Sequence, residues 1–120
     1  MRRLPLMPAL LLVAGLSAQA PVKSLNELKA FYVASCARCH GPDGSGRTPK
    51  GKKLCAPDFT DATVMARKSD ERMVKAIRKG IFFGVVMPPF KKRVSEVEAQ
   101  VMVSELLRKA EKGKDITPAR

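Results

Sequence analysis

Two cysteines and a histidine stand within five consecutive residues of this chain, at Cys36, Cys39 and His40. Positions i, i+3 and i+4 share one face of a helical turn, so the two thiols and the imidazole can act on one ligand. Two thiols at this spacing can form thioethers with the two vinyl groups on one edge of a haem, while the adjacent imidazole binds the iron. C-x-x-C-H is the attachment pattern of c-type haem. His40 is also the only histidine in the chain, which favours a dedicated role as an iron ligand.

Three other interpretations of these residues are weaker. A disulfide between Cys36 and Cys39 would leave His40 without a role. A thioredoxin-like redox pair normally accompanies a βαβ pattern, which the sequence lacks. A zinc site built from Cys36, Cys39, His40 and Cys55 has suitable donors, but the chain has no second C-x-x-C or H-x-x-x-H half. Haem attachment is therefore the favoured chemistry.

The second axial position of the iron cannot be filled by another histidine. Methionine, lysine or an open position remain, and a methionine thioether would favour reduced iron and raise the potential. Three of the four methionines after residue 20 fall in helical segments, where methionine usually fills the core: Met65, Met73 and Met102. Met87 instead precedes Pro88 and Pro89, which lack N–H donors and hold the preceding residue extended. A stiff strap of this kind can hold a sulfur over a flat ring, so we predict Met87 as the ligand.

Capping signals predict three helices, over residues 24–34, 69–79 and 95–112. The first and third open on the capping-box pattern Ser-x-x-Glu. The second opens on a serine followed by two acidic residues and closes on Arg-Lys-Gly, which suits the helix dipole. A weaker turn follows Thr60, and no segment shows the alternating pattern of a strand. We expect a small all-α fold, with three main helices and proline- and glycine-rich loops wrapped around one covalently bound haem.

The first twenty residues are typical of a secretory signal peptide. Arg2 and Arg3 precede a short apolar stretch, and Ala18-Gln19-Ala20 has the small-x-small form of a cleavage site. Export would deliver the mature chain to the periplasm as a soluble protein. The predicted organisation is a signal peptide at residues 1–20, one domain at residues 21–113 and a frayed tail at residues 114–120.

Residues 24–112 resemble a class I c-type cytochrome of the monohaem cytochrome c family. The likeness rests on four features that occur in the same order. These are an N-terminal helix running into Cys36-Ala37-Arg38-Cys39-His40-Gly41, a middle helix, a Met87-Pro88-Pro89-Phe90 loop and a C-terminal helix.

This resemblance implies one haem c per chain, attached through Cys36 and Cys39, with His40 and Met87 as axial ligands of its iron. It also implies that the two end helices pack across each other. The family uses a proline carbonyl to accept the imidazole N–H, and we expect Pro57 in this role. One departure concerns the C-terminal helix, where the family often places an aromatic residue and this chain does not.

Basic residues outnumber acidic ones along the chain. The formal net charge is +12, and it falls to +10 without residues 1–20, which hold two arginines and no acid. Such an excess creates a field that steers acidic partners, with Lys91, Lys92 and Arg93 closest in sequence to the Met87 loop. We expect a monomer whose partners are acidic redox proteins, with an anionic membrane surface as a further candidate. Nucleic acid is not expected as a partner.

Together these features predict an electron carrier and not an enzyme. With both axial positions filled the iron binds no substrate, so the protein would carry single electrons between periplasmic redox proteins. Two alternatives are a haem subunit that delivers electrons into a periplasmic oxidoreductase complex, and a haem-based ligand sensor. The sensor requires that Met87 does not hold the iron.

Other residues carry smaller expectations. Cys55 is expected to be a small apolar filler near the haem, with a dimer-forming disulfide as the alternative. Phe82, Phe83 and Phe90 are expected to wall the methionine side of the site.

Overall fold

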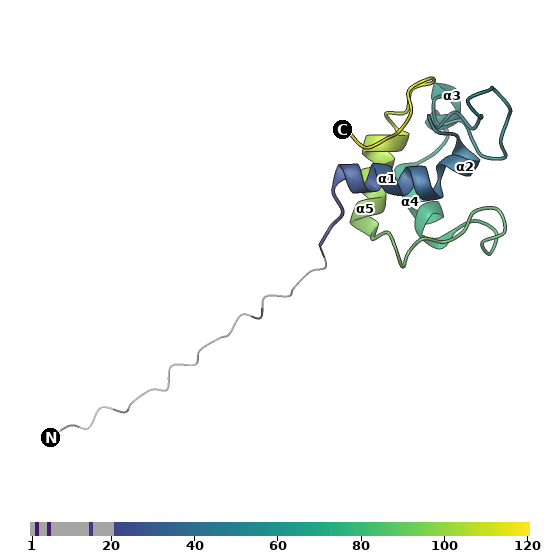
Figure 1. Ribbon diagram of the computed structural model, residues 1–120. Coiled ribbons are helices and arrows are strands. Elements are labelled where there is room, and N and C mark those ends of the chain that lie inside the picture. The colour runs from purple at the N-terminus through teal and green to yellow at the C-terminus, as the bar shows by residue number, and fades with distance from the viewer. Residues whose placement is uncertain (1, 3–4, 6–14, 16–20) are drawn as a thin grey trace.

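The computed structural model describes residues 2, 5, 15 and 21–120, so the predicted signal peptide at residues 1–20 lies almost wholly outside the described residues. The helices are α1 (Leu25–Ser35), α2 (Ala37–His40), α3 (Ala62–Ala66), α4 (Asp70–Lys79), α5 (Glu96–Met102) and the π-helix η1 (Val103–Leu107). Long loops connect them (Figure 1). In this described part the only extended pairing is two isolated bridges, and the predicted all-α fold is confirmed. None of its helices is both long and apolar enough to cross a bilayer.

The predicted capping residues begin the three main helices. At α1 the Glu27 N–H donates to Ser24 Oγ at 3.2 Å, and the Ser24 N–H donates to the Glu27 carboxylate at 2.6 Å. Ser95 and Glu98 form the same reciprocal pair at α5. Ser69 caps α4. Each cap satisfies N–H groups that the helix itself leaves without partners, which is why these starts are readable from local sequence.

The core lies where α1 crosses α5 and η1. Leu28 and Tyr32 of α1 are fully buried, and they face buried Met102, Val103 and Leu106 from the C-terminal segment. α1 and α5 are in contact, and Figure 1 shows the crossing. The expected packing of the two end helices is confirmed. Aliphatic and methionine side chains of the C-terminal helix fill the crossing without an aromatic residue there.

The last helical segment ends earlier than predicted. It stops at Leu107 and not near Lys112, and its final turn is widened, with the Arg108 N–H donating to the Val103 carbonyl at 2.9 Å. A hydrogen bond over five residues is characteristic of a π-helical turn, and Leu107 at its end is buried.

The chain beyond residue 107 is tied down and does not fray as expected. The Gly113 N–H donates to the Asp43 carboxylate at 2.8 Å, and the Ile116 N–H donates to the Pro42 carbonyl at 2.8 Å. The Ile116 side chain is 8% exposed and belongs to the core. Asp43 and Gly113 are 70 residues apart, so no local signal could have predicted that Ile116 of the tail packs into the core.

Candidate functional site

Cys36, Cys39 and His40 stand on a helical turn that directly continues α1. The Cys36 N–H donates to the Tyr32 carbonyl at 2.8 Å, and the His40 N–H donates to the Cys36 carbonyl at 2.9 Å. The buried Tyr32 hydroxyl donates to the Gly41 carbonyl at 2.7 Å and ties the end of the turn back to α1. Burial, followed by the nearby Cys36 and Asp43, raises the pKa of Tyr32, so this hydroxyl remains a donor. The predicted turn is thus held at both ends.

The two motif thiols are free and half-buried. Burial, and next the neighbouring Cys39, raise the pKa of the Cys36 thiol to about 12. Redox-active cysteines have lowered pKa values, so this environment does not suit a thioredoxin-like pair. The structure also contains no disulfide between Cys36 and Cys39. In residues 21–120 no three His, Cys, Asp or Glu side chains are placed to hold a metal ion together, so the zinc set with Cys55 is not assembled.

The His40 imidazole is half-buried and oriented by one aromatic neighbour. Phe59 stacks on it with ring centroids 4.6 Å apart and an interplanar angle of 17°. Burial, and next the charge of Lys68, lower the pKa of His40 to about 4, so the ring is neutral at pH 7. A neutral imidazole is the form that binds a metal. Sequence reasoning did not assign Phe59 a role, because its contact with His40 depends on the loop that the tertiary fold brings back.

The predicted hydrogen bond between His40 and the Pro57 carbonyl is not formed. His40 Nδ1 is buried and has no hydrogen-bond partner, although Pro57 lines the same cavity as the imidazole. The prediction rested on the family's use of a proline carbonyl after the motif, and here Pro57 reaches the cavity without accepting a hydrogen bond from the imidazole. An orphaned buried nitrogen is uncommon in a folded protein and marks a place where chemistry is expected.

Met87 is placed by the end of α4. Gly80 ends that helix with φ +73°, and a Cβ at Gly80 would lie 2.5 Å from the Met87 carbonyl oxygen. The backbones approach this closely because the Ile81 N–H donates to that same carbonyl at 2.9 Å. Met87 is half-buried and packs against the core. Glycine is therefore required where the methionine loop turns back on the helix.

Two adjoining cavities, of about 90 and 80 Å³ and here called the central cavities, bring the predicted ligands together. Both are lined by the same five residues: Cys36, His40, Pro57, Ile81 and Met87. Cys39 and Cys55 line the second cavity, so Cys55 lies at the site although it is exposed. Met73 and Met102 line the first cavity from helices, whereas Met87 lines both from a loop.

These residues fit haem c. Two free thiols stand on one turn, beside a neutral imidazole whose buried Nδ1 lacks a partner. A thioether from a separate loop lines the same cavities. The remaining walls are mostly apolar, among them Phe59, Ile77 and Leu107, as a dry redox site requires.

The expectation for the loop phenylalanines is correct for one and wrong for two. Phe90 lines the second central cavity and meets Phe31 edge to face, with ring centroids 5.5 Å apart. Phe82 and Phe83 line neither cavity and are 69% and 100% exposed. Their apolar side chains predict burial, but the tight turn at Ile81 directs them outward.

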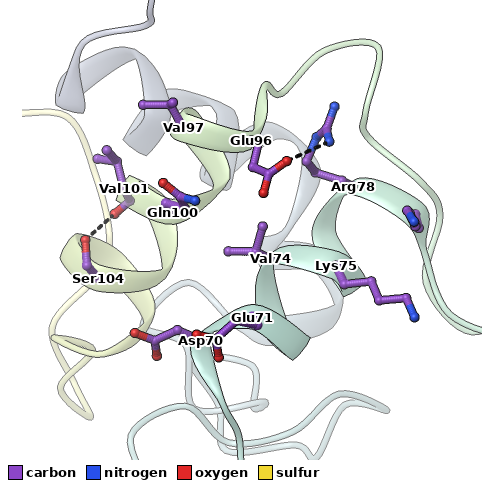
Figure 2. Close-up of a pocket in the computed structure, with 11 residues that line it drawn as sticks. Asp70, Glu71, Val74, Lys75, Arg78, Glu96, Val97, Gln100, Val101 and Ser104 are labelled. Atoms are coloured by element: carbon purple, nitrogen blue, oxygen red, sulfur yellow. Dashed lines mark hydrogen bonds and ion pairs between the residues drawn. The ribbon is translucent and has the colours of Figure 1, made fainter.

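A larger groove lies elsewhere, between α4 and α5 (Figure 2). Its walls carry mixed charge, including Asp70 and Lys75, and Arg78 pairs with Glu96 across it at 3.6 Å. It contains none of the motif residues. The groove is therefore separate from the site that holds Cys36, His40 and Met87.

Comparisons with known proteins agree with this chemistry. Residues 23–104 match the family model described as cytochrome C oxidase, cbb3-type, subunit III. The structure of the KustC0563 c-type cytochrome is 34% identical, with a TM-score of 0.56, and the match covers 70% of this chain and 96% of that one. The c-type cytochrome NirC is 23% identical, with a TM-score of 0.56, over 77% of this chain and 92% of that one.

The c-type cytochrome XoxG from Methylobacterium extorquens AM1 is 24% identical, with a TM-score of 0.52. That match covers 80% of this chain and 57% of XoxG. At such identities NirC and XoxG bear on the fold alone. No curated protein matches this chain.

Proposed function

Because this chain belongs to the class I c-type cytochromes, which carry covalently attached haem c, we propose that it shuttles single electrons between periplasmic redox proteins. In this proposal Cys36 and Cys39 attach the haem, and His40 and Met87 are the axial ligands. The observation that carries the assignment is that His40 and Met87 line the same cavities beside the two free thiols. Bound haem supplies an iron that gains and loses one electron.

The chain's own residues would set the conditions for that exchange. Phe59 fixes the plane of the imidazole, and the Tyr32 hydroxyl holds the turn that presents it. Gly80 lets the Met87 backbone approach the end of α4. The apolar walls exclude water, and a thioether ligand favours the reduced state. These conditions suit reversible one-electron exchange, which is the chemistry of an electron carrier.

The axial assignment is tested by the weak near-infrared charge-transfer band of sulfur-to-iron ligation in the ferric protein. We expect the wild type to show the band and Met87→Ala to lose it. Met65→Ala is the matched control, because Met65 is 7% exposed in the core and lines neither central cavity. A band that survives Met87→Ala would place the sulfur ligand elsewhere, with Met73 and Met102 next to be tested. A wild type without the band would favour a nitrogen ligand, for which Lys68 lies in the first cavity, or the open position of a ligand sensor.

A second candidate function is a haem subunit that delivers electrons into an oxidoreductase complex. The description of the matching family model, which is that of an oxidase subunit, favours it. Size-exclusion chromatography of a native extract, followed by haem absorbance, separates the two. A free shuttle elutes at the mass of the mature monomer, below the 13.1 kDa of the full chain, whereas a subunit co-elutes with a larger catalytic partner.

The proposed location rests on the N-terminal segment. Arg2, Arg3 and the apolar residues after them predict export, and removal of residues 1–20 would leave Pro21 as the first residue. Mass spectrometry of the holoprotein purified from the periplasmic fraction measures the new N-terminus. An intact Met1 in that material would contradict cleavage.

A further inference from the structure

The loop between α4 and the Met87 strap is closed at its base. The Ile81 N–H donates to the Met87 carbonyl at 2.9 Å, and the Met87 N–H donates to the Ile81 carbonyl at 3.4 Å. Residues 82–86 form the tip, here called the apolar tip. In Figure 1 the green segment that leaves α4 and returns to α5 projects from the body of helices. The two bonds fix the tip outside the core.

The apolar tip exposes an unusual set of side chains. Phe82 is 69% exposed, Phe83 100%, Val85 79% and Val86 64%. Val86 lines the second central cavity, so the haem site accounts for part of its placement. Phe82, Phe83 and Val85 line neither cavity. Haem attachment therefore gives no reason for these three apolar side chains to face solvent together.

The backbone holds these side chains outward at a conformational cost. Phe82 and Phe83 both have φ +53°, the left-handed region that bulky L-residues rarely adopt. Tight turns of this kind normally use asparagine or glycine. Two consecutive phenylalanines in this conformation are thus a feature to be explained by an interaction, since strained backbone persists chiefly at functional positions.

The segments that lead into and out of the tip are rich in basic residues. Between residues 72 and 95 the chain has no Asp or Glu and seven basic residues: Arg72, Lys75, Arg78, Lys79, Lys91, Lys92 and Arg93. The two ends of the loop lie side by side, because the Lys91 N–H donates to the Arg78 carbonyl at 3.1 Å. Lys79, Lys91 and Lys92 therefore gather at the base of the apolar tip.

We propose that the apolar tip inserts into the headgroup region of an anionic phospholipid bilayer while the lysines at its base contact the phosphates. Aromatic and aliphatic side chains at a projecting point, with cations behind them, are the arrangement that binds such an interface. A protein partner fits less well. A specific protein interface buries roughly 800 Å² on each side, far more than one narrow tip can cover.

The test uses the holoprotein as purified and sedimentation with two kinds of vesicle. One kind is phosphatidylcholine, and the other is phosphatidylcholine and phosphatidylglycerol in equal parts. We expect binding to the anionic vesicles and on the order of tenfold weaker binding to the neutral ones, because each nearby cation contributes to attraction. The Phe82→Ser, Phe83→Ser double variant should bind the anionic vesicles on the order of tenfold more weakly than the wild type.

The matched control is Val33→Ser, Val97→Ser, which removes two apolar residues that are 48% and 54% exposed on α1 and α5. It should bind like the wild type. Any N-terminal apolar segment that remains on the purified protein is present in every variant, so it does not change the difference in vesicle binding between variants. An unchanged haem spectrum verifies folding, and sedimentation does not depend on the electron-carrier proposal. Equal binding by the phenylalanine variant and the wild type overturns the proposal. If this variant binds vesicles like the wild type but exchanges electrons more slowly with an acidic redox protein, the proposal is also overturned, and the tip is a protein contact.

Discussion

The two predicted iron ligands rest on supports of different kinds. His40 stands on a turn that three kinds of contact hold: helical hydrogen bonds, the Tyr32 bond to Gly41 and the Phe59 stack. Met87 depends on a close backbone approach at Gly80 and two hydrogen bonds to Ile81. The loop beyond them faces solvent.

The difference teaches where this domain is rigid and where it can change. Removing one contact around the turn that carries His40, here called the histidine side, leaves other contacts that keep the turn in place. The loop that carries Met87 is called the methionine side. Around Met87 the close approach at Gly80 and the two hydrogen bonds to Ile81 lie at neighbouring residues, so a single substitution at Gly80 should disturb them together and release the sulfur. Segments with few buried contacts open at the lowest free energy, and the methionine side is such a segment.

The largest effect is expected from removing the attachment points on the histidine side. Cys36→Ala, Cys39→Ala should lose the haem and, because the ring supplies much of the core, the fold. Cys55→Ala should keep both, since Cys55 is exposed. Extraction with acid and organic solvent measures the covalent link. Haem released from the wild type by this treatment would show that thioethers do not hold it.

A smaller but selective effect is expected at Gly80. In Gly80→Ala the new Cβ would meet the Met87 carbonyl oxygen at 2.5 Å and the Pro89 nitrogen at 2.9 Å, so the strap must move. We expect the near-infrared band to disappear while the haem stays attached. Gly113→Ala is the matched control, because Gly113 also has positive φ but no atom within 4 Å of its Cβ. That variant should keep the band and lose about 1 kcal/mol of stability from backbone strain alone.

On the histidine side, Tyr32→Phe should lower the free energy of unfolding by about 1–2 kcal/mol and leave the near-infrared band in place. The loss arises because the buried Gly41 carbonyl loses its shorter hydrogen bond and keeps only the one from the Gly44 N–H at 3.2 Å. Chemical denaturation followed by absorbance measures it. Loss of the band in Tyr32→Phe would mean that the two sides are coupled, and the contrast between them would fail.

The sequence predicted the parts of this site that short segments specify. The Cys36, Cys39 and His40 spacing, the serine caps and the proline strap after Met87 each act within a few residues of the chain. The end of the last helix, the packed tail and the Phe59 stack could not be read in this way. Each depends on a partner far along the chain, such as Asp43 for Gly113. The prediction that Phe82 and Phe83 wall the site is wrong. Apolar side chains are usually buried, but here the backbone turn at Ile81 decides their direction.

Acid should weaken the histidine side through Asp43. Burial opposes ionisation of this carboxyl, but hydrogen bonds from Gly113 and Ser45 hold its pKa below the ordinary value of 3.8. A depressed folded-state pKa contributes stability above pH 3.8, and that stability is lost as pH falls through the folded-state value. Asp43→Ala should therefore cost about 1 kcal/mol at neutral pH and less below pH 3.8. A cost that does not change with pH would show that the carboxylate charge is not responsible.

The smallest effect concerns electron exchange with an acidic redox protein. Lys91→Glu, Lys92→Glu should slow the second-order rate a few-fold at low salt, because steering acts on encounter. The effect should shrink near 0.1 M salt, where the Debye length is about 10 Å. Arg93 is left intact because its guanidinium lies 4.8 Å from the centre of the Phe31 ring.

The control for this charge reversal is Lys109→Glu, Lys112→Glu, which changes the net charge equally in the segment that follows η1. Arg108 does not serve as a control. It donates to Asp70 and to the Met65 carbonyl, both at 2.8 Å, so reversing it would disturb packing between segments. Both double variants should keep the near-infrared band. A larger slowing from the lysines after the methionine loop locates docking on that side of the molecule, whereas equal slowing would mean that partners sense only net charge.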